Sequence, residues 1–273
     1  MSMNFDRNRT QKEFELLVGI NSIDELASKK DDFISYELKY TDLPLLSQCL
    51  RDDAIDYFYN GLVSFCEGID SAVNYRFSWA TIKLYYSVYY MLRSSLAIKG
   101  RAILQNKSVF LLKLAEGEIP QKKRSTSTIK YSNTHEATIN HHISISSEND
   151  YLLSNEIDGN NTYHWMKSLR EIVNYRCVSF QEPSYLACWH KFAEANKLGS
   201  LSSLFNKIEA TPDIYCFQED YAIVSIPFKR TLLTLDELRR KGFCNCLHDV
   251  RKQHITVIFP EVLSQVDSLT NYP

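Results

Sequence analysis

Hydrophobic residues recur at helical spacing through the middle of the chain. Within residues 54–73 the large apolar side chains follow one another at alternating steps of three and four: Ile55, Phe58, Leu62, Phe65, Ile69 and Ala72. This spacing predicts an amphipathic helix, because such steps place side chains on one face. Asp52 or Asp53 is expected to cap its start, where a carboxylate accepts free backbone N–H groups.

Residues 78–98 predict a second helix that is apolar on nearly every side. One stripe of this helix contains Trp79, Ile82, Tyr86, Tyr89, Leu92 and Leu96. A helix of this kind belongs in the centre of a bundle, so we expect it to pack along the first helix, parallel or antiparallel. Gly100 stands where a left-handed residue often ends a helix. The neighbouring tyrosines could form core or stack on bases, and helical spacing favours the core: Tyr85, Tyr86, Tyr89 and Tyr90.

Weaker patterns extend the helical prediction on both sides. Short helices are expected at residues 11–18, 43–50 and 134–142. Longer ones are expected at residues 162–180 and from Pro183 to just before Gly199, since proline suits the first turn. The helix at 162–180 should bury Trp165, Met166, Leu169, Ile172 and Val173.

The pattern changes after residue 208. Residues 214–217 and 221–228 are apolar runs around polar turn residues, which predicts a hairpin, and residues 254–259 predict another strand. Residues 234–241 predict a short helix. The fold class predicted is therefore mainly α, a helical bundle with a small C-terminal α+β appendage. The expected divisions are an acidic segment at 1–42, the bundle at 43–207 and the appendage at 208–273.

Composition narrows the class of protein. The chain has 273 residues, is 44% hydrophobic and 23% charged, and carries a net charge of −2, which excludes a disordered chain and a histone-like polycation. Its N-terminus is polar, so we expect no signal peptide and a cytoplasmic protein. The longest strongly apolar run, residues 84–92, is too short for a bilayer, and no membrane partner is expected. The 7 cysteines lack framework spacing and are expected to be reduced.

Residues 121–130 form a basic stretch without an acid. Its cations are Lys122, Lys123, Arg124 and Lys130. Such a stretch can be a solvated loop, which composition alone favours, or a patch that contacts the phosphates of a nucleic acid.

A second cluster could in principle hold a metal. Cys244, Cys246 and His248 lie within five residues, but a zinc site usually needs two separated ligand pairs. Structural cysteines are therefore favoured, and no metal or other cofactor is expected.

Two stretches of the chain resemble the HEPN superfamily. Residues 78–90 read SWATIKLYYSVYY and lead to Lys99-Gly100, which is similar to that family's central aromatic helix. Residues 165–176 read WMKSLREIVNYR, similar to the late helix that carries the family's polar motif. The resemblance implies a helical bundle. Many members are metal-independent ribonucleases of toxin–antitoxin, CRISPR and phage-defence systems, and others only bind.

Catalytic members of that family carry an arginine followed, after a short spacer, by a histidine, and pair two motifs by dimerisation. Arg170 fits the arginine, but Arg176 stands where the histidine is expected, and residues 171–189 contain none. A homodimer is compatible with this resemblance.

The polar side chains of this helix also suggest a chemistry independently of the family. Arg170 and Asn174 are four residues apart and should share a helix face, with Arg176 about two turns away at most. Two guanidinium groups and an amide suit phosphate binding, but arginine stays protonated and is a poor acid–base catalyst. Alternatively, Arg170 pairs with a carboxylate such as Asp70 and is structural.

The upstream histidines leave the question of catalysis open. His135, His141 and His142 could supply the missing base, although isolated surface histidines are the commoner explanation. The sequence therefore fits three functions. The first is a non-catalytic or weakly catalytic subunit that binds a protein partner or RNA, in a bacterial phage-defence or toxin–antitoxin assembly. The others are a metal-independent ribonuclease and a structural adaptor for an ATPase or nuclease subunit.

Overall fold

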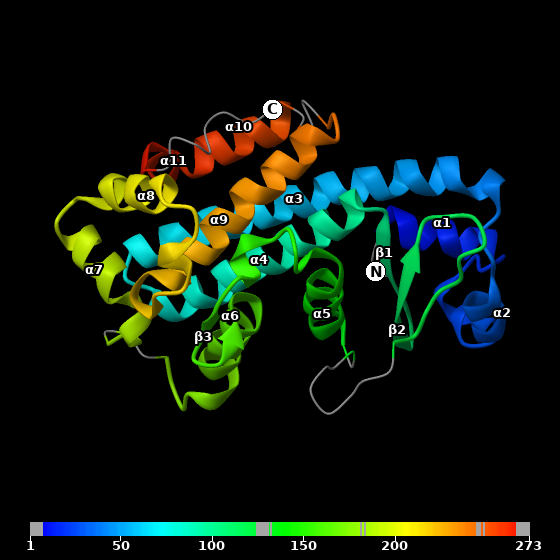
Figure 1. Cartoon of the computed structure of the whole chain (residues 1–273), viewed down its shortest axis with the longest axis horizontal. Coiled ribbons are helices and arrows are strands. Elements are labelled where there is room, and N and C mark those ends of the chain that lie inside the picture. The colour runs from blue at the N-terminus through cyan, green and yellow to red at the C-terminus, as the bar shows by residue number, and fades with distance from the viewer. Residues whose placement is uncertain are drawn as a thin grey trace, which may run out of the picture. The chain divides into compact units, whose positions relative to one another are not determined.

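The protein is mainly helical, as its sequence predicts. The computed structural model describes residues 8–123, 131, 133–180, 182, 184–243, 247 and 249–265 (Figure 1). The chain divides into two compact units. Unit 1 comprises Met1–Tyr57 and Arg93–Ser144, and unit 2 comprises Phe58–Leu92 and Ile145–Pro273. None of the described helices combines the length and the apolar character needed to cross a membrane.

Two long helices, α3 (Leu43–Val73) and α4 (Phe77–Ile98), confirm the predicted pair. They are antiparallel in unit 2, where Lys83 forms an ion pair with Glu67. Gly100 has a φ of 71°, the left-handed conformation expected after α4. The short helix expected at 43–50 is the beginning of α3.

The predicted cap of the α3 region is wrong. Asp53 lies inside α3, and its carboxylate accepts the backbone N–H groups of Arg9 and Thr10 at 2.8 and 2.9 Å. It therefore satisfies the start of a different helix, α1 (Arg9–Leu17). The first turn of a helix needs acceptors, and the fold supplies this one from a residue distant in sequence.

Unit 1 packs helices against a β-hairpin that the sequence did not reveal. The strands are β1 (Arg101–Asn106) and β2 (Ser108–Lys113), paired antiparallel, and Figure 1 shows them beside α1. The other elements of unit 1 include α2 (Lys30–Ser35), α5 (Thr134–Ser146), η1 (Ile23–Leu26) and η2 (Tyr40–Asp42). Phe33 contacts the rings of both Phe14 and Phe110, which joins α1, α2 and the hairpin in one core.

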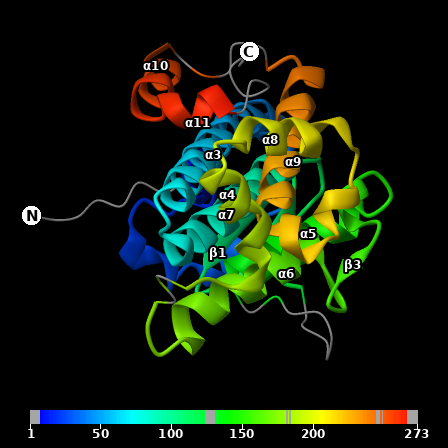
Figure 2. The same cartoon turned by 90° about the vertical axis from the view of Figure 1, so that its left-hand side faces the viewer.

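Unit 2 is helical except for the two short strands β3 (Glu156–Ile157) and β4 (Asn160–Asn161) among its described residues. Its helices are α6 (Thr162–Glu171), α7 (His190–Lys197), α8 (Leu201–Ala210), α9 (Glu219–Arg240), α10 (Asp249–Ile258) and α11 (Pro260–Gln265). The 3-10 turns are η3 (Tyr151–Leu153), η5 (Ala187–Trp189) and η6 (Ile214–Cys216). Figure 2 shows α8 and α9 side by side, and Phe228 of α9 contacts Phe205 of α8 and stacks on Phe65 of α3.

The predicted C-terminal strands are wrong. Residues 214–217 contain the turn η6, residues 221–228 begin α9, and residues 254–259 lie mostly in α10. An unbroken apolar run such as residues 221–228 suits a buried strand or a buried helix equally, and periodicity cannot separate them. In the structure this run is the beginning of α9, which is buried on nearly every side and contains Pro227. The helix expected at 234–241 is the end of α9.

The buried face of α4 also differs from the predicted one. Trp79 is 49% exposed, whereas Leu84, Val88 and Met91 are buried. Core packing of Tyr85 and Tyr89 is confirmed, while Tyr86 and Tyr90 are half-buried. A helix with apolar residues on nearly every side has no unique inward face in its sequence, so its neighbours determine the face that is buried.

Two helices of unit 2 are shorter than expected. The helix at 162–180 is α6 followed by a π-helical turn over Ile172–Arg176, where it ends. The next helix begins at His190, and Pro183 lies outside the described residues.

Two glycines of α3 provide a matched test of how closely it approaches α4. A Cβ at Gly68 would lie 2.7 Å from Leu84 Cδ2 and 3.3 Å from its backbone nitrogen, whereas at Gly61 it would meet the flexible end of Met91 at 2.8 Å. Alanine gains about 1 kcal/mol of helix propensity at either position. We expect Gly61→Ala to be neutral or stabilising and Gly68→Ala to destabilise by about 1–3 kcal/mol through overpacking. Urea unfolding would measure both, and equal effects would contradict the close approach.

Candidate functional site

Arg170 lies among tyrosine rings in unit 2. One guanidinium N–H donates to the Tyr86 hydroxyl at 3.3 Å. The guanidinium carbon is also 5.7 and 5.8 Å from the ring centres of Tyr85 and Tyr86, and 5.1 Å from that of Tyr175. Cation–π attraction of this kind holds a planar guanidinium in one orientation.

The electrostatics of the site keep Arg170 charged. Partial burial lowers its pKa, but the hydrogen bond to Tyr86 and the surrounding tyrosines outweigh burial, and the pKa is raised above its ordinary value. Arg170 therefore provides a fixed positive charge and cannot act as a general base. Its Nε is buried without a hydrogen-bond partner among the described residues, a costly arrangement that folding alone does not explain.

The two other residues predicted for this site, Asn174 and Arg176, are exposed. They lie in the π-helical turn, so the shared α-helical face expected for Arg170 and Asn174 does not apply. The described contacts of Arg170 are to tyrosines and do not include Asn174 or Arg176. Arg176 instead lies near Glu171, where Lys167 first and then the nearby cations lower the pKa of the carboxyl group.

The alternative prediction, an ion pair between Arg170 and Asp70, is wrong. Asp70 forms its ion pair with Arg76, at 2.9 Å. Arg170 is therefore held by aromatic rings rather than by that carboxylate, and its charge is not neutralised by it.

Four apolar side chains at the start of α4 and in the chain after α6 are exposed, and one of them, Tyr175, lies beside Arg170. We call Trp79, Tyr175, Val178 and Phe180 the α6 patch. Tyr175 is 70% exposed, and Val178 is fully exposed. The rings of Trp79 and Phe180 contact each other edge to face at 5.4 Å.

The segment after the π-helical turn is anchored to the start of α4. Glu182 accepts hydrogen bonds from the backbone N–H and the hydroxyl of Ser78, at 2.7 and 2.8 Å. This carboxylate therefore holds the segment that carries Val178 and Phe180 close to Trp79. The α6 patch could not be predicted from the sequence, because an apolar residue in a sequence carries no sign of whether it is buried or exposed.

Two of the three histidines considered as a base are placed differently from the expectation, whereas His135 is half-buried. His141 and His142 are buried in α5 of unit 1, so they are not surface residues. Burial, together with Arg101, Lys123 and His142, lowers the pKa of His141 to about 4. Such a histidine is neutral at physiological pH and is packed as part of the core.

The basic stretch is described only in part. Lys122 and Lys123 are exposed, and the Lys122 ammonium donates to the Ser108 hydroxyl at 3.0 Å. Arg124 and Lys130 lie outside the described residues, so a phosphate-binding patch here stays a prediction.

The possible metal ligands Cys244, Cys246 and His248 also lie outside the described residues. Within the part of the chain that is described, no group of three or more metal-ligating side chains occurs. Burial raises the pKa of three described cysteine thiols to about 12: Cys66, Cys188 and Cys216.

Comparisons with known proteins identify no relative of this chain. The chain matches no protein-family model, no curated protein and no solved structure at a significant level. The resemblance to HEPN domains therefore stays an expectation from sequence, and the function must be inferred from the site itself.

Proposed function

We propose that this chain is a non-catalytic binding subunit that holds a protein partner through Arg170 and the α6 patch. Two observations carry this proposal: the exposed Tyr175 ring beside a guanidinium that tyrosine rings already hold in place, and the exposed pair of Trp79 and Phe180. Tryptophan, tyrosine and arginine are the residues that contribute most to protein–protein binding. An arginine fixed before binding loses little conformational freedom on complex formation, which favours affinity.

The non-catalytic part of the proposal follows from the chemistry of Arg170. Cleavage of RNA by its 2′-hydroxyl requires one group to accept a proton and another to donate one. Arg170 stays protonated and is surrounded by tyrosines, so it can stabilise negative charge but not accept a proton. The assignment of the whole chain to a bacterial phage-defence or toxin–antitoxin assembly rests on the HEPN resemblance alone.

Single-stranded RNA is the second candidate partner. The Tyr175 ring is exposed and lies 5.1 Å from the Arg170 guanidinium, a pairing that could stack a base and neutralise its phosphate. This candidate differs from the first in the nature of the partner and not in the surface used.

A photo-crosslinking amino acid at position 175 of the full chain tests the proposal in native cells. Tyr40, which is 72% exposed in unit 1, provides a matched control position. We expect a discrete protein adduct from position 175 and none from position 40. A second change in the patch, Val178→Asp, should reduce that adduct at least tenfold, because a charge on an interface core opposes burial.

Three outcomes would contradict the proposal. Adducts that are equal at both positions would show that the patch is not an interface. An adduct removed by ribonuclease would favour RNA as the partner. Cleavage of mixed RNA by the purified chain, without metal and lost in Arg170→Ala, would show that the subunit is catalytic.

A further inference from the structure

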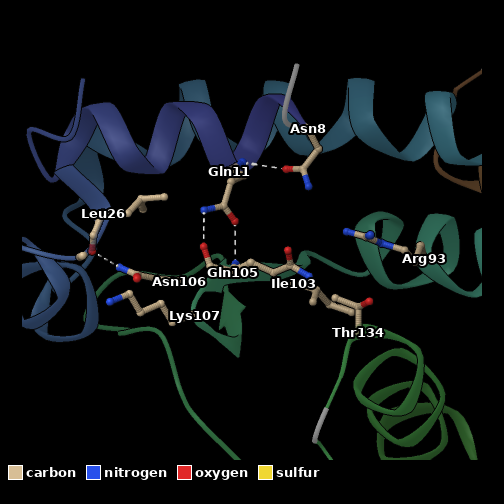
Figure 3. Close-up of a pocket in the computed structure, with 10 residues that line it drawn as sticks. Asn8, Gln11, Leu26, Arg93, Ile103, Gln105, Asn106, Lys107 and Thr134 are labelled. Carbon is tan, nitrogen blue, oxygen red and sulfur yellow. Dashed lines mark hydrogen bonds between the residues drawn. The ribbon is translucent and has the colours of Figure 1, made fainter. Parts of the chain in front are cut away.

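Unit 1 contains a cavity of about 480 Å³ between α1, the hairpin and the start of α5 (Figure 3). Its volume falls in the range of about 300–1,000 Å³ that is usual for small-molecule sites. Ten residues line it: Asn8, Gln11, Leu26, Ala27, Arg93, Ile103, Gln105, Asn106, Lys107 and Thr134.

The lining residues are arranged along an elongated space. In Figure 3, Arg93 and Thr134 lie at one end, and Lys107 and Asn106 at the other. Between them, the Gln11 side-chain amide accepts from the backbone N–H of Gln105 at 2.8 Å and donates to its carbonyl at 3.0 Å. This paired amide joins α1 to β1 in the middle of the wall, between the two ends where the cationic side chains lie.

The charge of the lining is positive. Arg93 and Lys107 are cationic, and none of the ten described lining residues is acidic. The Arg93 guanidinium lies 4.3 Å from the ring centre of Tyr57, a cation–π contact that orients it at the cavity wall. Asp53 already accepts the first N–H groups of α1, so the side chains and not that helix end give the cavity its charge.

Two features distinguish the hairpin end of the cavity. Lys107 joins β1 to β2 with a φ of 53°, a left-handed conformation that glycine adopts without strain and lysine does not. Asn106 is 1% exposed, and its Oδ1 has no hydrogen-bond partner within the described residues, although its Nδ2 donates to the Leu26 carbonyl at 3.0 Å. Strained backbone and unsatisfied polar atoms are concentrated at binding sites.

We infer that this cavity binds a small organic polyanion, with one anionic group at Lys107 and another at Arg93. The anionic groups are phosphates or carboxylates, which both cations bind. A hydroxyl or amino group of the ligand donates to Asn106 Oδ1, and its carbon skeleton contacts Leu26 and Ile103. This function is separate from partner binding in unit 2, and either can hold without the other.

Calorimetric titration of the full chain at low salt tests this inference with three probes: ATP, tripolyphosphate and citrate. We expect saturable binding of at least one probe at a single site. Binding of ATP or tripolyphosphate alone would identify phosphate as the ligand chemistry, and binding of citrate alone would identify carboxylate. No saturable binding of any probe would overturn the inference.

Lys107→Gly separates a binding role from a structural one. We expect it to weaken probe binding at least tenfold, because the cation is lost, without lowering the melting temperature of the ligand-free chain, because glycine relieves the left-handed backbone. Lys113→Gln removes a charge from the same hairpin outside the cavity lining and should leave affinity unchanged. Equal loss in both variants, or a lower melting temperature for Lys107→Gly, would overturn the inference.

Discussion

Asp150→Ala is expected to destabilise unit 2 by about 3–5 kcal/mol, the largest effect of any single substitution considered, because it leaves a buried guanidinium without a main partner. The side chains of Arg230 and Asp150 are 1% and 3% exposed and form an ion pair at 3.1 Å. The Tyr163 hydroxyl donates to the same carboxylate, and Arg230 also pairs with Glu237 at 3.0 Å.

The protonation of this network follows from its contacts. Burial alone would lower the pKa of Arg230, but Glu237, Tyr163 and Asp150 outweigh it and raise the pKa well above its ordinary value. Arg230 therefore stays charged in the core and requires its carboxylates. Burial, then the Asp150 charge, also raises the pKa of Tyr163, so this hydroxyl keeps its proton and remains a donor.

Glu237→Ala provides the matched control for Asp150→Ala. Its side chain is 21% exposed, so solvent can replace it in part, and we expect a smaller loss than for Asp150→Ala. Tryptophan fluorescence during urea unfolding would follow unit 2 selectively, because Trp79, Trp165 and Trp189 all belong to it. A loss below about 1 kcal/mol for Asp150→Ala would show that the network is not required for stability.

The same network is built from contacts that the sequence does not encode locally. The long helices α3 and α4 could be predicted, since their apolar residues repeat at the period of the helix itself. Arg230 pairs with Asp150 across 80 residues, and no local pattern carries information about that contact. The C-terminal strands were predicted wrongly for the same reason, because the surroundings of residues 221–228 and not their composition determine their conformation.

The surroundings of Arg170 could not be predicted from the sequence. The HEPN resemblance points to Arg170, but Tyr86, its hydrogen-bond partner, lies 84 residues away. The change to a π-helical turn at Ile172 was not visible in the sequence, and it moves Asn174 and Arg176 out of the expected α-helical arrangement. The cavity of unit 1 could not be predicted at all, because it is assembled from segments that are distant along the chain.

Acidification is expected to destabilise unit 1 through His141. This side chain is 8% exposed, and burial first, then Arg101, Lys123 and His142, lowers its pKa from 6.5 to about 4. The unfolded chain therefore takes up a proton at a higher pH than the folded chain does. The stabilisation is fully present above pH 6.5 and is lost as the pH falls towards 4, by about 3 kcal/mol in all.

His141→Gln separates this contribution from the titration of carboxylates. Glutamine does not ionise, so the variant should lose about 3 kcal/mol less than the wild type between pH 7 and pH 4. Unit 1 can be followed by amide hydrogen exchange in α5, corrected for the intrinsic effect of pH, during urea titrations at each pH. Because Glu and Asp residues are the same in both chains, only their difference reports on His141. Identical pH dependence of the two chains would show that His141 is protonated as readily in the folded protein as in the unfolded one, and that its burial in α5 carries no electrostatic cost.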